Sequence, residues 1–137
     1  MNNLQIHPLH EGTSAYATAC ILSRVKKLDR DELRSFAKRL MHSISNSSMK
    51  QGAKVIGHIK AYIEYQDGFL HAHTVGEDDD ITVDGRDGGP TDRVKLVVNS
   101  IIFGLPEKAV KEATEEAIKE TSAQFGLVQE PASISSE

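Results

Sequence analysis

The chain has 137 residues, 39% of them hydrophobic and 26% charged, which is the composition of one folded globular domain. A formal net charge of -4 argues against a general attraction to nucleic acid or to anionic lipid. Cys20 is the single cysteine, which excludes an intrachain disulfide and cysteine-rich zinc motifs. With no long apolar run, either near Met1 or elsewhere, we expect a cytoplasmic protein that has no signal peptide, membrane or nucleic-acid partner.

The first patterned segment, residues 15–27, fits two structures. Ala15, Ala19, Leu22 and Val25 have helical spacing, whereas Ala17, Ala19, Ile21 and Val25 suit a strand. We prefer the strand, because it agrees with the sheet that the rest of the chain predicts.

A helix is predicted to begin at Asp29, since Asp29 and Glu32 have the spacing of a capping box. One apolar face follows at helical spacing, formed by Leu33, Phe36, Ala37, Leu40, Met41 and Ile44. Residues 45–48 are expected to form a polar loop. A second helix is predicted from Pro106, with an apolar stripe that includes Val110, Ala113 and Ala117 and a stop at Gly126.

Between the helices the apolar period changes to two, which predicts a strand over residues 55–65. Asp67-Gly68 is a hairpin signal, with residues 69–75 as the return strand. Placing these two residues in the turn sets Glu64 opposite His71 and Tyr62 opposite His73. Residues 93–103 are predicted to form a largely buried central strand.

These elements predict an α+β domain: a ferredoxin-like, four-stranded antiparallel sheet with both helices on one face. The expected divisions are an N-terminal extension over 1–14, the domain over 15–126 and a disordered tail over 127–137. Within the domain, 76–92 is an acidic insertion with a short extra strand near 81–83.

Several local strings resemble a known family. The strand Val55-Ile56-Gly57-His58-Ile59-Lys60-Ala61, its hairpin, the run from Val94 to Leu105 and the helix start Asp29-Arg30-Asp31-Glu32-Leu33 are together similar to the C-terminal domain of CobW-type metallochaperone GTPases. No phosphate-loop string and no multi-cysteine motif is present, so no nucleotide-binding residue carries over. The resemblance implies a stand-alone, non-enzymatic accessory domain in metal or corrinoid cofactor maturation. Its expected partner is a separately encoded P-loop GTPase or a metalloprotein client.

The histidines carry the most suggestive chemistry. On the hairpin, His58, Lys60, Tyr62, Glu64, His71 and His73 share the polar face, which should be the open face of the sheet. His71, His73, Glu64 and His58 form a candidate ligand set for zinc, cobalt or nickel. The same surface also suits a homodimer interface, with Tyr62 and Lys60 as contacts, or plain solvated surface. On the strand model Cys20 is expected to approach this open face.

Other patterns are weaker. The acidic stretch beginning at Asp80 lacks the spacing of a calcium loop, because Thr91 stands where a bidentate glutamate is required. We expect no enzyme activity, and no catalytic residue is assigned. The alternative is a small homodimeric ligand-binding protein or enzyme that uses the histidine-rich face; a third interpretation is a subunit whose open face only dimerises.

Overall fold

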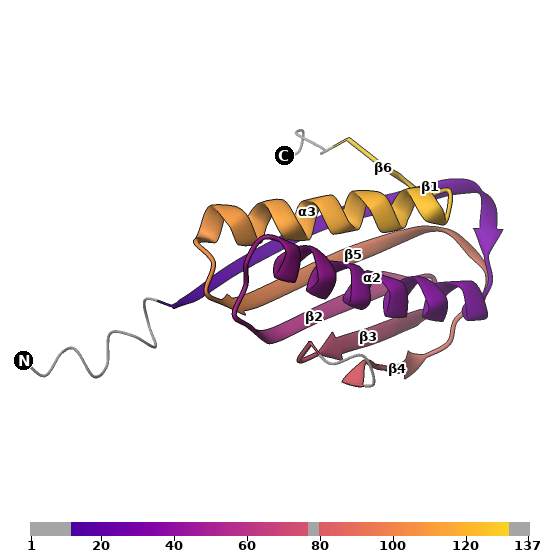
Figure 1. Ribbon diagram of the computed structural model, residues 1–137. Helices are drawn as coiled ribbons and strands as arrows, with labels where there is room; N and C mark the ends of the chain where they lie inside the picture. The colour runs from indigo at the N-terminus through magenta and orange to yellow at the C-terminus, as the bar shows by residue number, and fades with distance from the viewer. Residues whose placement is uncertain (1–11, 77–79, 132–137) are drawn as a thin grey trace, which may run out of the picture.

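Six strands and two helices form the part of the chain that the structure, a computed structural model, describes: residues 12–76 and 80–131 (Figure 1). In chain order the elements are β1 (Thr13–Leu28), α2 (Arg30–Lys50), β2 (Val55–Tyr65), β3 (Gly68–Thr74), β4 (Thr82–Arg86), β5 (Thr91–Phe103), α3 (Glu107–Gln124) and β6 (Val128–Gln129). No helix within these ranges is both long and apolar enough to cross a membrane.

The strands form one antiparallel sheet in the order β4-β3-β2-β5-β1-β6. The prediction of a four-stranded sheet is therefore wrong, although the chain is α+β. The four predicted strands are the inner ones, and β4 and β6 add the two edges. The short extra strand expected near 81–83 is found as β4, whereas β6 has two residues, too few for a periodic pattern.

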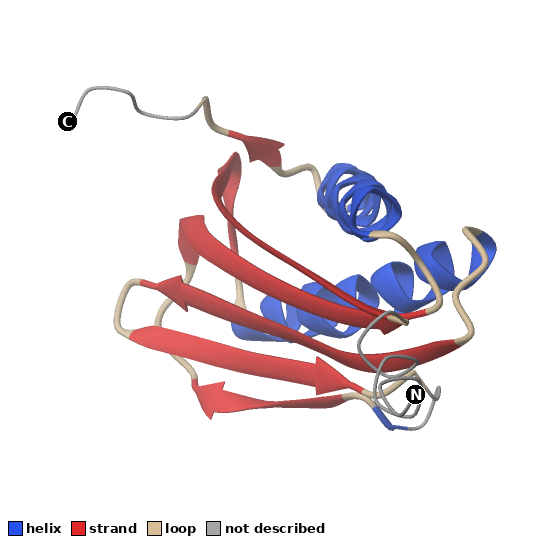
Figure 2. Cartoon of the chain, turned by 90° about the vertical axis from the view of Figure 1, so that its left-hand side faces the viewer, coloured by secondary structure: helices blue, strands red, loops and turns tan. Residues whose placement is uncertain are grey.

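Both helices cover the same side of the sheet, and neither lies on the other side (Figure 2). The core lies between these layers, where α2 contributes an unbroken buried face and β2 and β5 supply alternate residues. Phe36 of α2 packs edge-on against Phe125, which follows α3, with ring centroids 5.5 Å apart. One face of the sheet thus supplies the core, and the other is left uncovered by the described helices.

The strand interpretation of the first segment is confirmed, since β1 pairs with β5 from Thr13 to Ser23 and again at Leu28. The register breaks between these points, and Val25 is fully exposed there. Arg24 holds this bend, because its guanidinium donates to the carbonyls of Lys26 and Phe125 and to both carboxylate oxygens of Glu32. Sequence alone does not indicate this role, since Arg24 belongs to a run of basic residues.

The capping box at Asp29 is confirmed, with Asp29 accepting from the Glu32 amide and Glu32 accepting from the Asp29 amide. The predicted loop over 45–48 is wrong, because α2 continues to Lys50. Ser48 lies four residues after Ile44 and is fully buried, so a small polar residue extends the buried face by one turn.

The hairpin forms, but its predicted register is wrong by two residues. Gln66 and Asp67 occupy the turn, with Asp67 at φ 63, and the ladder pairs Tyr62 with His71 and Lys60 with His73. Because side chains alternate with period two, this shift exchanges partners and leaves every side chain on its predicted face.

A bulge at Gly57 changes the start of β2, since Ile56 pairs with Ile102 and His58 with Ile101. Both Ile56 and Ile59 thereby reach the core, which an unbroken alternation does not allow. The position needs glycine, because a Cβ there would lie 2.8 Å from the Ile101 carbonyl oxygen.

Parts of the predicted boundaries lie outside the described residues: 1–11 of the extension, 77–79 of the insertion and 132–137 of the tail. Within the described part of the insertion, β4 pairs with β3. Of the described residues after 126, Val128 and Gln129 pair with β1, and the Glu130 amide donates to the Ile21 carbonyl.

Candidate functional site

The candidate site is the sheet surface opposite the helices, which we call the open face. The strand registers arrange its side chains in rows that cross the sheet from β4 to β1. Three rows are Thr82, His73, Lys60, Asn99 and Ala17; Asp84, His71, Tyr62, Val97 and Ala19; and Arg86, Phe69, Glu64, Lys95 and Ile21, with a shorter row of His58, Ile101 and Ala15 beside the first.

Rings gather on the half of the open face formed by β2 and β3. The Tyr62 ring lies 4.9 Å from that of His71 and 6.0 Å from that of Phe69, measured between centroids. The Arg86 guanidinium lies 5.8 Å from the centre of the Phe69 ring. These contacts form one raised cluster of rings, held by neighbours on adjacent strands.

The other half, formed by β1 and β5, carries small and aliphatic side chains, with Lys95 and Asn99 next to the aliphatic residues of β5. Ala15, Ala17 and Ala19 follow one another along β1 and are exposed, beside the half-buried Val97 and Ile101 of β5. The expectation that residues 93–103 are largely buried is wrong for this side of β5.

Two hollows open along the middle and the β1 side of this surface, and a third, of about 350 Å³, lies at its end beside Ile21, Glu64 and Lys95. One of about 320 Å³ lies at the centre and is lined mainly by Lys60, Tyr62, His71, His73, Val97 and Asn99. The other, of about 280 Å³, lies beside Ala19 and Ile21 and reaches Arg93, Lys95 and the segment 129–131. The second hollow borders the small-residue half of the face, where the alanine side chains extend only a short way from the backbone of the sheet.

The candidate metal ligands lie on the open face as predicted, but in four successive rows. Only His58 and His73 are close neighbours, with ring centroids 6.0 Å apart; His71 contacts Tyr62, and Glu64 lies in the row of Lys95. Among residues 12–76 and 80–131, no group of three or more His, Cys, Asp or Glu side chains is placed to hold a metal ion. The ligand set therefore stays a prediction.

Cys20 lies on the opposite side of β1 from Ala19 and Ile21, where it packs against the core beneath α3. Its predicted approach to the open face is wrong, because that face carries the odd-numbered residues of β1. Burial raises the pKa of the Cys20 thiol above its ordinary value, which disfavours the reactive thiolate.

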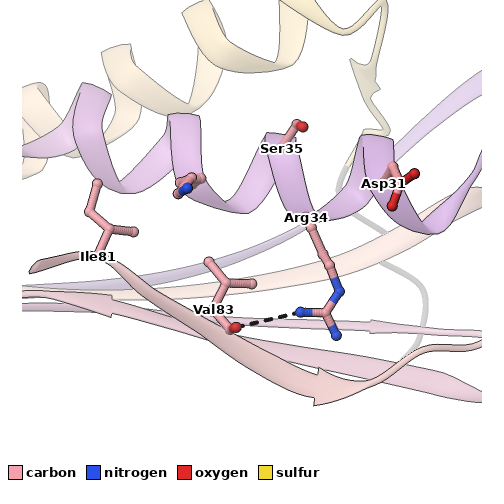
Figure 3. Close-up of a pocket in the computed structure, with 6 residues that line it drawn as sticks. Asp31, Arg34, Ser35, Ile81 and Val83 are labelled. Atoms are coloured by element: carbon pink, nitrogen blue, oxygen red, sulfur yellow. Dashed lines mark hydrogen bonds between the residues drawn. The ribbon is translucent and has the colours of Figure 1, made fainter. Parts of the chain in front are cut away.

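A larger hollow, of about 480 Å³, lies on the helix side between α2 and β4 (Figure 3). Arg34 extends from α2 toward β4, where it donates to the Asp87 carboxylate at 3.0 Å and to the Val83 carbonyl at 3.5 Å. Arg30 adds a second, longer ion pair to Asp87. The guanidinium groups of Arg30 and Arg34 therefore already contact a carboxylate of the chain itself.

Comparison with known proteins identifies no family model and no curated protein that matches the chain. Among solved structures, it is similar to the zinc-bound YjiA GTPase from E. coli, a CobW-family protein, with 14% identity and a TM-score of 0.38. A zinc-bound triple mutant of the same GTPase gives 14% identity and a TM-score of 0.39. Each alignment covers 77% of this chain and 30% of the GTPase chain.

Proposed function

We propose that the chain is a non-enzymatic protein-binding domain and that the open face is its binding surface. The observation that carries this proposal is one row of ring and apolar side chains that crosses four strands on the uncovered side of the sheet: His71, Tyr62, Val97 and Ala19. Lys60 and Asn99 flank this row on one side, and Glu64 and Lys95 flank it on the other. Exposed apolar and aromatic side chains bordered by polar ones are typical of an interaction site.

The shape of the open face favours a macromolecular partner over a small molecule. Small-molecule sites are concave and surround their ligand, whereas this surface extends over several strands, and its central hollow shares no lining residue with the hollow beside Ala19. Aromatic residues are also enriched at the centres of protein interfaces, where they bury large areas at low entropic cost.

The sequence resemblance to CobW-type C-terminal domains places this binding role, in our proposal, in metal or corrinoid cofactor maturation. On that view the domain acts as an accessory module, and a P-loop GTPase or a metalloprotein client is the kind of partner it serves. The proposal assigns the domain no catalytic residue and no resident metal.

Histidine labelling tests the binding surface without knowledge of the partner. Diethyl pyrocarbonate modifies accessible imidazoles. His71 and His73 are exposed in the single chain and report on the open face, and the equally exposed His42 of α2 serves as the matched control. We expect His71 and His73 to react more slowly than His42 in the purified protein or in a lysate of the producing cell. Equal reactivity in both preparations would show the open face to be ordinary solvated surface.

A second candidate is a ligand- or metal-binding protein, favoured by the central hollow and by the neighbouring rings of His58 and His73. Two imidazoles on adjacent strands are a partial zinc, cobalt or nickel site. Calorimetric titration with zinc separates the two functions: this candidate requires binding that His73→Ala abolishes, and the protein-binding proposal requires none.

A further inference from the structure

We propose that the occupant of the open face is a second copy of the chain, packed sheet against sheet around a twofold axis that runs parallel to the strands between β2 and β5. This inference rests on the proposed function, because it names the partner of the same surface. It predicts an isologous dimer, in which each contact occurs twice.

The strand order makes the open face suited to this symmetry. Rotation about a twofold axis that is parallel to the strands and lies between two facing sheets keeps each row at the same level along the strands and reverses the order of the strands. In the order β4-β3-β2-β5-β1-β6, the twofold rotation places β2 over the β5 of the second copy and β3 over its β1. Sheets that face each other in this aligned way normally cross at about 30°. The facing rows therefore stay aligned near the axis and diverge toward the sheet edges.

In this arrangement each row places larger ring side chains of one copy over smaller side chains of the other. Tyr62 meets Val97 of the second copy, His71 meets Ala19, and Phe69 meets Ile21. The rings of His71 and Phe69 thereby reach the hollow of about 280 Å³ beside Ala19 and Ile21. Each copy thus offers the ring cluster of β2 and β3 to the low, small-residue half of the other.

The charges in the same register are complementary. Glu64 and Lys95 are neighbours within one chain and share a row. The twofold rotation therefore places each Glu64 over the Lys95 of the other copy. Four charges of alternating sign then meet around the axis, which favours this register over one in which like charges face each other.

The extent of the surface corresponds to a small interface, of the kind found in dimers that dissociate on dilution. Strand spacing of about 4.8 Å and a repeat of about 6.7 Å give each facing side chain about 30 Å² of flat sheet. The residues of β3, β2, β5 and β1 on the open face then cover roughly 500 Å², to which the relief of the side chains adds. A standard interface buries about 800 Å² per partner.

Lys60 is expected to destabilise the dimer, because the twofold rotation places it over Asn99 of the second copy rather than over an acidic residue. Its long aliphatic stem lets the ammonium group extend toward the sheet margin and remain hydrated. We therefore expect Lys60→Gln to tighten the dimer, a gain that a surface without a partner would not show.

Mass measurement across a range of concentrations tests the dimer directly. The chain has a mass of 15.0 kDa, and light scattering coupled to gel filtration should report twice that mass. Ala17→Arg, which places a bulky charge opposite His73 of the second copy, should raise the dissociation constant by roughly thirtyfold or more. Ala123→Arg makes the same change at an exposed position of α3 and should leave the dimer intact, with circular dichroism confirming the fold of both variants.

Charge reversal tests the register. Glu64→Lys and Lys95→Glu each place like charges around the axis, so neither variant alone should dimerise well. Mixing the two variants puts opposite charges together between chains and like charges together within each chain. Recovery of a dimer that contains one copy of each variant, seen by native mass spectrometry, is the expected result.

The outcomes separate this inference from the proposed function. A wild-type chain that stays at 15.0 kDa at every concentration, or a dimer unaffected by Ala17→Arg, overturns the second copy as occupant. If the face histidines of such a monomer are nevertheless protected in lysate, the occupant is a different protein and the proposed function stands. If they are unprotected as well, both proposals fail.

Discussion

Two buried hydroxyl groups connect α3 to β5. Thr114 donates to Ser100 at 2.9 Å, and both side chains are fully buried. The pair explains why a polar residue interrupts the apolar sequence of β5: Ser100 faces the helix layer and finds its partner there, while the adjacent Asn99 faces the open side. Such a pair stabilises the layer contact only while both members are present.

Thr114→Val removes one member and leaves the Ser100 hydroxyl buried without its partner. We expect a loss of about 1–3 kcal/mol in the free energy of unfolding, measured by urea denaturation monitored by circular dichroism. The double variant Ser100→Ala with Thr114→Val removes both hydroxyls and should recover part of that loss. A double variant as unstable as the sum of its single changes would contradict this account.

Among the elements, α2 is fixed at its first turn by charged side chains from outside the helix. The Arg24 guanidinium, together with the Asp29 amide, holds the pKa of the Glu32 carboxyl below its ordinary value. A carboxyl with a lowered pKa in the folded protein contributes stability above the ordinary carboxyl range. That contribution is lost as the pH falls through the folded-state pKa.

Glu32→Gln should therefore be less stable than the wild-type chain near pH 7 and lose less stability on acidification. The difference between the two proteins should hold from pH 7 to about pH 5 and shrink below about pH 4, the ordinary range of a glutamate. Urea unfolding at a series of pH values measures it. A difference that is constant down to pH 3 would show that Glu32 acts through shape alone.

The same elements show how far the sequence predicts the fold. The capping box, the helical spacing of α2 and the alternation in β2 are local signals, and the structure confirms them. The exact hairpin partners, the bulge at Gly57 and the pairing of β4 and β6 depend on contacts between distant segments, so local periodicity does not predict them.

Sequence analysis predicted one half of the candidate site, the half formed by β2 and β3. The face of His58, Tyr62 and His71 followed from alternation in the hairpin, and a two-residue slip in register left it unchanged. The half formed by β1 and β5 was missed, because alanines give a weak pattern and an apolar run such as 94–103 does not reveal which of its residues face away from the core.

For the whole molecule, the most direct test of the sheet-on-sheet dimer is a nuclear Overhauser contact between the Phe69 ring and the Ile21 methyl groups. Within one chain these residues lie three strands apart, about 14 Å at ordinary strand spacing, which is too far for such a contact. We expect a cross peak in an isotope-filtered experiment on a mixture of labelled and unlabelled chains, and its loss on dilution. No cross peak, with Phe69 and Ile21 resonances unchanged across the concentration range, would contradict the sheet-on-sheet dimer.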